Sequence, residues 1–288
     1  MIPRKTVCRW LSVVSAIALL ALSARGADET VRYKTVSREL VESRLKKYAG
    51  SDQEREATLK HMFGDAGCDD RHLSEQAVRG AKQPNVICLL PGSSDRVIIV
   101  GAHFDHVSAG DGVVDNWSGA SLLPSLYEAV KVEPRKHSYI FIGFTDEEKG
   151  EVGSRFYARQ MTNEQAAATD AMVNMDTLGL AQTEIWASHS DRRLCSALVY
   201  IAKQLGLPVK SVDVDQIGST DSVQFAARKI PSITIHSLTQ ATWNARILHT
   251  SKDRISVMRL DDYYQTYGLV AAYLAFLDRV ASANTGQQ

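Results

Sequence analysis

Short apolar runs alternate with amphipathic segments along most of this chain, and this alternation limits its fold more than any other feature. Apolar runs bounded by turn residues predict buried strands, and longer segments with apolar residues every three or four positions predict helices. Strands are expected over residues 97–100, 139–145, 171–175 and 233–235, and helices over residues 119–130, 153–161, 192–205, 221–227 and 261–280. Such alternation predicts a three-layer α/β sandwich, in which helices flank a mixed, largely parallel central sheet.

The chain ahead of residue 97 adds further elements to this pattern. Near-helical spacing of Val36, Leu40, Val41 and Leu45 predicts a helix over residues 35–49, and residues 53–66 continue the pattern. Short strands are expected over residues 72–78 and 85–90, and later in the chain over residues 184–187. A chain of 288 residues with 44% hydrophobic content can bury one large core. We therefore expect a single domain over residues 27–288, with an N-terminal helical segment at residues 30–67.

The first 26 residues have the character of a secretory signal peptide. Arg4, Lys5 and Arg9 precede an apolar run over residues 11–22, and small residues follow around Gly26. The apolar run is too short to span a bilayer, so we expect cleavage and no stable membrane insertion. Location would then be secreted or periplasmic. The mature chain would carry 29 basic and 33 acidic residues, without the basic excess of a nucleic-acid-binding protein.

Export permits disulfide bonds, and three cysteines follow the signal peptide. Cys68 and Cys88 flank a short stretch that can double back, so we predict that they pair. The alternative is that all three are free, buried thiols. Cys195 lies on an expected helix and is interpreted as a core residue.

Polar side chains follow several of the predicted strands directly. His103 and Asp105 come after the run at 97–100, Glu147 and Glu148 after the run at 139–145, and Asp176 after the run at 171–175. Ligand sites in α/β sheets form at the carboxyl ends of the strands. Asp115 lies in the loop after the first of these strands, and His249 follows the apolar pair 247–248, interpreted as another strand end.

Each of these side chains alone has an ordinary structural explanation, such as a helix cap, a turn or a solvated helix start. Their convergence is harder to explain without a ligand. Carboxylates gathered at one sheet edge repel one another and raise each other's pKa values. Bound cations would relieve that repulsion.

The motifs GAHFDHV (residues 101–107), DNWSGAS (115–121), DEEKG (146–150), NMDTLG (174–179) and LHT (248–250) resemble the M28 family of co-catalytic zinc peptidases. The resemblance covers about residue 85 to the C-terminus, with the motifs in family order. It implies a zinc-exopeptidase-like fold, a peptide substrate and two Zn²⁺ per chain. The implied ligands are His103 and Asp176 for one ion and Glu148 and His249 for the other, with Asp115 as the bridge.

The same resemblance implies that Glu147 is the general base and acid and that Asp105 orients His103. Charge supports these roles, since Asp115, Glu148, Asp176 and a bridging hydroxide neutralise two Zn²⁺ and leave Glu147 free to accept a proton from the attacking water. The expected function is an exported aminopeptidase that releases the N-terminal residue of peptides. Residue preference and oligomeric state are not readable from the sequence.

The sequence departs from the family pattern at two places. Many members have Ser-Asp-His where this chain has Thr220, Asp221 and Ser222, which puts substrate contacts in doubt but not metal binding. Some members have a tyrosine before the last histidine ligand, where this chain has Leu248. Trp243 and Asn244 are candidates to shape the specificity pocket.

Other readings of the chain stay open. A single-zinc acyltransferase similar to glutaminyl cyclases would share the fold and most motifs, although the 115–119 loop resembles the peptidase version. Carboxypeptidase or amidohydrolase activity at the same site, and a non-catalytic binding domain, are further alternatives. His106, His189 and His236 are interpreted as structural or rim residues rather than as metal ligands.

Overall fold

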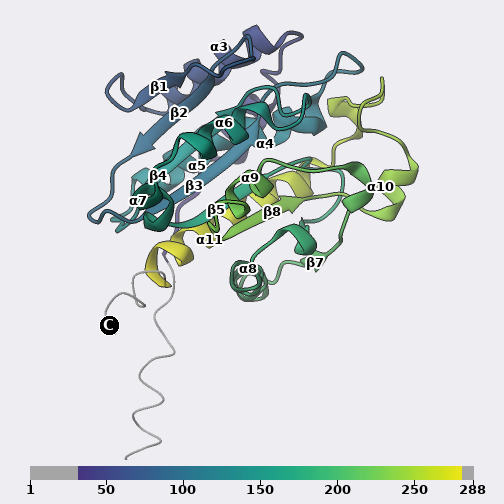
Figure 1. The fold of residues 1–288 in the computed structure, drawn as a ribbon. Coiled ribbons are helices and arrows are strands. Elements are labelled where there is room, and N and C mark those ends of the chain that lie inside the picture. The colour runs from purple at the N-terminus through teal and green to yellow at the C-terminus, as the bar shows by residue number, and fades with distance from the viewer. Residues whose placement is uncertain (1–31, 281–288) are drawn as a thin grey trace, which may run out of the picture. The chain divides into compact units, whose positions relative to one another are not determined.

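The computed structural model describes residues 32–280, and an eight-stranded sheet forms its centre (Figure 1). The strand order is β1-β2-β4-β3-β5-β8-β6-β7. The strands are β1 (Leu73–Gln76), β2 (Asn85–Leu90), β3 (Val97–His103), β4 (Ser138–Phe144), β5 (Thr169–Met175), β6 (Glu184–Ile185), β7 (Lys210–Ser211) and β8 (Ser232–His236). The signal-peptide prediction at residues 1–26 lies outside the described residues.

The four strands β4, β3, β5 and β8 run parallel, because helices connect them. The pairs β1–β2, β2–β4 and β6–β8 are antiparallel, and the short pair β6–β7 is parallel. The prediction of a mixed, largely parallel sheet is therefore confirmed.

Helices cover both faces of the sheet, because side chains of the central strands alternate between two buried layers. On β3, Ile98 and Val100 belong to a large core on one face, and Ile99 belongs to a smaller core on the other. The large core includes α2 (Arg38–Leu45), α3 (Asp52–Asp65), α5 (Leu122–Lys131), α8 (Arg192–Gln204) and α11 (Leu260–Val280). The smaller core includes α6 (Val152–Gln160), α7 (Asn163–Ala168) and α9 (Ser222–Ala226), which lie in front of the sheet in Figure 1.

Shorter elements complete the described chain. They are a π-type turn (Val113–Trp117) that runs into α4 (Ser118–Ala120), α10 (Gln240–Asn244), and the 3₁₀ turns Ala187–His189, Asp215–Ile217 and Ile255–Val257. The sequence did not predict α7, β7 or α10, because each has six residues or fewer and shows too little hydrophobic periodicity to be detected. Within residues 32–280, no helix combines the length and apolarity that a bilayer crossing requires.

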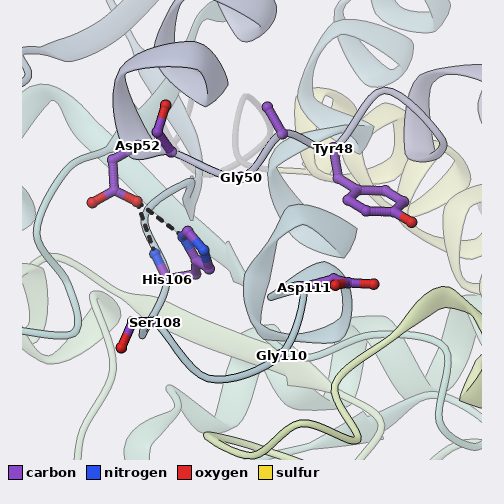
Figure 2. A pocket seen from close by; sticks show the side chains of 9 residues that line it. Tyr48, Gly50, Asp52, His106, Ser108, Gly110 and Asp111 are labelled. Atoms are coloured by element: carbon purple, nitrogen blue, oxygen red, sulfur yellow. Dashed lines mark hydrogen bonds and ion pairs between the residues drawn. The ribbon is translucent and has the colours of Figure 1, made fainter.

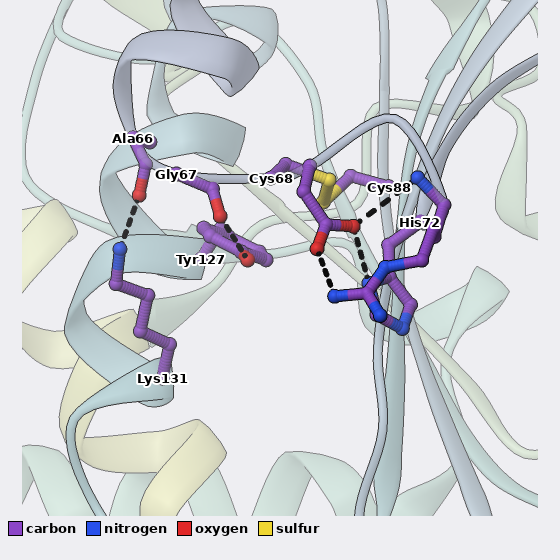
Figure 3. Close-up of a disulfide and its surroundings, with 9 residues drawn as sticks. Ala66, Gly67, Cys68, His72, Cys88, Tyr127 and Lys131 are labelled. Carbon is purple, nitrogen blue, oxygen red and sulfur yellow. Dashed lines mark hydrogen bonds and ion pairs between the residues drawn. A yellow bond between two sulfur atoms is a disulfide. The ribbon is translucent and has the colours of Figure 1, made fainter.

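The predicted disulfide between Cys68 and Cys88 is present (Figure 3). It joins the turn after α3 to β2, and both cysteines are buried. Two side chains of α5 bind the same turn. The Tyr127 hydroxyl donates to the Gly67 carbonyl at 3.0 Å, and the Lys131 ammonium donates to the Ala66 carbonyl. Cys195 is a free, half-buried thiol on α8.

Candidate active site

Three neighbouring parallel strands bring four of the predicted site residues to one edge of the sheet. His103 is the last residue of β3, Glu147 and Glu148 lie in the turn after β4, and Asp176 follows β5 directly. Because β3 pairs with both β4 and β5, these side chains approach one another. The local cause is ordinary strand geometry, since polar residues begin where the buried part of each strand ends.

One group of possible metal ligands consists of His103, Asp115 and Asp176. The Nε2 atom of His103 lies 3.3 Å from Oδ1 of Asp115 and 3.8 Å from Oδ1 of Asp176. His103 is buried, while Asp176 is partly accessible. One nitrogen and two carboxylate oxygens in this spacing are suitable ligands for a divalent cation of the zinc type.

A second group consists of Asp115, Glu148 and His249. The Nε2 atom of His249 lies 3.1 Å from Oδ2 of Asp115 and 3.0 Å from Oε2 of Glu148. The buried Oε1 atom of Glu148 has no hydrogen-bond partner within residues 32–280. Asp115 therefore offers Oδ1 to the first group and Oδ2 to the second, as a bridging carboxylate does.

Glu147 lies next to the first group without belonging to it. Its Oε2 atom is 3.9 Å from Nε2 of His103. The backbone N–H groups of Glu147 and Glu148 donate to the two oxygens of Asp105, at 3.0 and 3.2 Å. Asp105 thus fixes the turn that carries both glutamates.

Asp105 also contacts the other nitrogen of His103, mainly through its backbone. Nδ1 of His103 lies 3.2 Å from the Asp105 carbonyl oxygen and 3.5 Å from its carboxylate. A carbonyl partner on Nδ1 leaves Nε2 facing Asp115 and Asp176.

The electrostatics of the site show a need for positive charge. Burial opposes ionisation of His103, but the carboxylates around it, above all that of Glu147, hold its pKa well above the ordinary value. Hydrogen bonds to Asp115 and Glu148 raise the pKa of His249 to about 10. Burial raises the pKa of both Glu147 and Glu148. The raised pKa values favour protonated imidazoles, whose charge offsets that of the carboxylates. Metal ions would take over this role, and their binding would release the imidazole protons.

The backbone is strained close to these residues. Asp146, Thr177 and His249 have φ values of 51°, 59° and 57°, in the left-handed region that residues other than glycine rarely adopt. Asp146 precedes Glu147, and Thr177 follows Asp176. Such strain is concentrated at functional sites in proteins, where surrounding contacts hold it in place.

Three residues for which the sequence analysis predicted no positioning role hold the candidate ligands in place. The buried carboxylate of Asp253 accepts hydrogen bonds from the backbone N–H groups of Val114, at 2.7 Å, and Asp115, at 3.1 Å. The Asn116 amide links its loop to the end of β5, and the Thr220 hydroxyl donates to Oδ2 of Asp176 at 2.7 Å. The only sequence signal for Asp253 is its position four residues after His249.

Glycines allow the closest backbone approaches around the site. A Cβ atom on Gly119 would lie 2.5 Å from the Met175 carbonyl oxygen, and one on Gly153 would lie 2.5 Å from the Thr145 carbonyl oxygen. These two glycines let α4 and α6 approach the ends of β5 and β4 closely.

Asp221 is a further buried carboxyl group behind the site. It precedes α9 and is fully buried, and burial raises its pKa to about 7. Its neighbour Thr220 contacts Asp176 directly. The sequence analysis noted this stretch only as a departure from a family pattern. It did not predict the burial of Asp221, because that burial depends on the packing of α9 against β5.

The remaining polar candidates lie outside the two ligand groups. His106 bonds to Asp52, and Nε2 of His236 lies 2.9 Å from the Val212 carbonyl oxygen in the core. His189 lies 3.2 Å from Asp215 at the surface. Trp243 is 39% exposed on α10.

The expectation that His249 ends a strand is wrong. Residues 245–251 form turns between α10 and the 3₁₀ turn Ile255–Val257. The apolar pair 247–248 packs against the large core instead of pairing in the sheet. Only tertiary packing distinguishes such a pair from a short strand.

Residues 85–274, about two-thirds of the chain, match Peptidase family M28. The chain belongs to peptidase family M28. The match begins at β2 and includes all seven site residues predicted from the sequence, from His103 to His249. The family resemblance of the five motifs is thereby confirmed.

Two curated relatives are similar to this M28 chain over part of their length. Aminopeptidase YwaD of Bacillus subtilis is 27% identical over 186 residues, covering 62% of this chain and 38% of the relative. Leupeptin-inactivating enzyme 1 of Streptomyces exfoliatus is 27% identical over 156 residues, covering 53% of this chain and 35% of the relative. The chain thus spans less than two-fifths of the length of these relatives.

Solved structures share the fold of this M28 chain. The LapA aminopeptidase of Legionella pneumophila has a TM-score of 0.72 at 18% identity, covering 97% of this chain and 80% of LapA. An Acidobacteriales bacterium glutaminyl cyclase has a TM-score of 0.70 at 17% identity, covering 88% of this chain and 98% of the cyclase. At these identities the similarity establishes the fold alone.

Proposed function

We propose that this chain is an exported di-zinc aminopeptidase that removes the N-terminal residue of peptides. The observation that carries the proposal is the position of Asp115, whose two carboxylate oxygens face two separate imidazoles, those of His103 and His249. A carboxylate placed in this way is suited to bridge two ions. Relatives named as aminopeptidases support the reaction class.

The side chains present fit two zinc ions. His103 and Asp176 would hold one ion, Glu148 and His249 the other, and Asp115 both. Imidazole nitrogen and carboxylate oxygen are zinc ligands. The Oε1 atom of Glu148, which has no hydrogen-bond partner within residues 32–280, could also bind an ion. When bound, a zinc pair polarises a substrate carbonyl and lowers the pKa of a water molecule.

Glu147 is the proposed proton carrier. Its carboxylate lies beside the first group but belongs to neither, and Asp105 fixes its backbone. It would accept a proton from the attacking water and return it to the amine that leaves. Its burial keeps bulk water from competing for that proton.

Export and the extent of the domain are part of the proposal. Residues 1–26 would direct secretion and be removed, and residues 27–288 would form one catalytic domain. The Cys68–Cys88 disulfide supports an oxidising compartment.

A substrate panel tests the proposed reaction. Zinc-loaded protein should release free amino acid from aminoacyl p-nitroanilides and leave their N-acetylated forms intact. A chelator should abolish this activity, and added zinc should restore it. Hydrolysis of the N-blocked substrates alone, or no hydrolysis at all, would contradict the proposal.

The panel also distinguishes the glutaminyl cyclase alternative, which the fold similarity to cyclases supports. A peptide with N-terminal glutamine should yield free glutamine from an aminopeptidase. Conversion to a pyroglutamyl peptide would favour the cyclase.

A further inference from the structure

The structure contains a cavity that is separate from both ligand groups (Figure 2). Its volume is about 440 Å³, within the size range of ligand pockets. Its walls come from the connection between α2 and α3, residues 48–52, and from the loop after β3, residues 106–111. None of the candidate metal ligands, nor Glu147, lines it.

The cavity adjoins the active site through the segments that carry the ligands. The loop at 106–111 lies between His103 and Asp115 in the chain. The Asp111 backbone N–H donates to the Asp253 carbonyl at 2.7 Å, which places the loop against the segment that follows His249. The loop that lines the cavity is therefore a direct neighbour of the segment that carries His249.

The buried Arg55 of α3 holds the two walls together. Its guanidinium donates to the Ala49 carbonyl at 2.8 Å, to the Gly112 carbonyl at 2.9 Å and to the Asp111 carbonyl. These bonds connect both wall segments to one rigid helix. Arg55 thus fixes the two wall segments relative to each other.

The lining is negatively charged. It includes Asp52 and Asp111 and contains neither lysine nor arginine. One oxygen of Asp52 accepts hydrogen bonds from the backbone and from Nδ1 of His106, at 3.3 and 3.0 Å.

Asp111 is the carboxylate available to a ligand. Within residues 32–280 its side chain makes no hydrogen bond or ion pair, and only its backbone is engaged. Figure 2 shows Asp111 and the ring of Tyr48 on one side of the cavity, with Asp52 and His106 on the other. An aromatic ring and a carboxylate that line the same cavity are a favourable environment for an organic cation.

We propose that this cavity is a substrate subsite for a lysine or arginine side chain beyond the scissile bond. The inference rests on the proposed aminopeptidase function. The N-terminal residue would be held at the ligand groups, so a side chain in a cavity that shares none of those residues belongs to a later position of the peptide. The subsite would make the enzyme prefer peptides with a basic residue after the N-terminal one.

Matched peptides test the subsite. Every peptide begins with the N-terminal residue that the zinc-loaded enzyme releases fastest. Lysine, or its uncharged analogue norleucine, occupies the second or the third position. At one of these positions kcat/KM should be about fivefold higher for the lysine peptide than for the norleucine peptide. The factor is small because partly exposed ion pairs are weak, and high salt should reduce it further. Asp111→Asn should remove the preference and keep cleavage of the norleucine peptides.

Asp95→Asn is the matched control, because Asp95 is an exposed carboxylate ahead of β3, at the opposite end of that strand from His103. It should keep the lysine preference. Equal cleavage of lysine and norleucine peptides at both positions, or an unchanged preference in Asp111→Asn, would overturn the subsite alone. Failure to cleave any of the peptides would overturn the aminopeptidase proposal and the subsite with it.

Discussion

Individual side chains at this site depend on partners that lie far away in the sequence. Asp115 faces His103, twelve residues before it, and His249, more than 130 residues after it. Asp253 supports Asp115 from that same distant segment. The roles of single residues can therefore be separated by substitutions that leave their neighbours in place.

Glu147→Gln tests the proton carrier at this scale. The amide keeps the size of the side chain but cannot accept the proton, so kcat should fall by about 10²–10⁴-fold. Metal content should stay unchanged, because Glu147 belongs to neither ligand group. Steady-state kinetics and elemental analysis of the same sample measure both quantities.

Glu164→Gln, on the exposed start of α7, is the control for Glu147→Gln and should retain wild-type activity. Full activity in Glu147→Gln would remove Glu147 from the mechanism. Loss of metal together with activity would instead make Glu147 a ligand.

Among the elements, the disulfide has the clearest energetic role, since it joins the turn after α3 to β2 (Figure 3). The two cysteines are 20 residues apart, and a loop of that size predicts a stabilisation of about 3 kcal/mol. Replacement of Cys68 and Cys88 by alanine should lower the free energy of unfolding by about that amount in urea denaturation.

Cys195→Ala provides the comparison, because this thiol is free on α8. Its unfolding midpoint should stay close to that of the wild type. A thiol titration of the denatured chain without residues 1–26 should find one free thiol. Three free thiols, or a double variant as stable as the wild type, would contradict the structural role.

The sequence predicted most elements because their apolar patterns are strong and local. The strands β3, β4 and β5 and the helices α8 and α11 match their predicted ranges within three residues. The rule that polar side chains after buried parallel strands meet at one edge pointed to His103, Glu148 and Asp176. The roles proposed for Asp115 and His249 came from the family resemblance of their motifs. Asp253, Thr220 and Arg55 were not predicted, since their importance depends on contacts between segments distant in the chain.

For the molecule as a whole, a buried histidine links the C-terminal helix to the sheet. Nε2 of His137 lies 2.9 Å from Asp170 on β5, and Nδ1 lies 3.1 Å from Asp278 on α11. Burial opposes its charge, but hydrogen bonds to these carboxylates raise the pKa of His137 to about 9. The ordinary value of an unfolded histidine is about 6.5.

Stability should therefore depend on pH through His137. A pKa raised in the folded state gives a contribution that is complete below about pH 6.5 and is lost as the pH rises through about 9. The free energy of unfolding, from urea denaturation, should fall across this range by on the order of 2–3 kcal/mol. His137→Gln should be less stable at pH 6 and show a flatter profile.

His61→Gln controls for the loss of a histidine as such, because His61 is exposed on α3. Its profile should follow that of the wild type. Parallel profiles for His137→Gln and the wild type between pH 6.5 and 9 would show that His137 carries no such contribution.

The central claim is that one carboxylate, Asp115, joins two metal positions in this chain. The most direct test counts zinc ions bound per chain after equilibration with zinc and removal of excess, for the wild type and for Asp115→Ala. The account predicts two ions in the wild type and a loss of tight binding at both positions in the variant. One ion in the wild type, or two ions retained by Asp115→Ala, would contradict it.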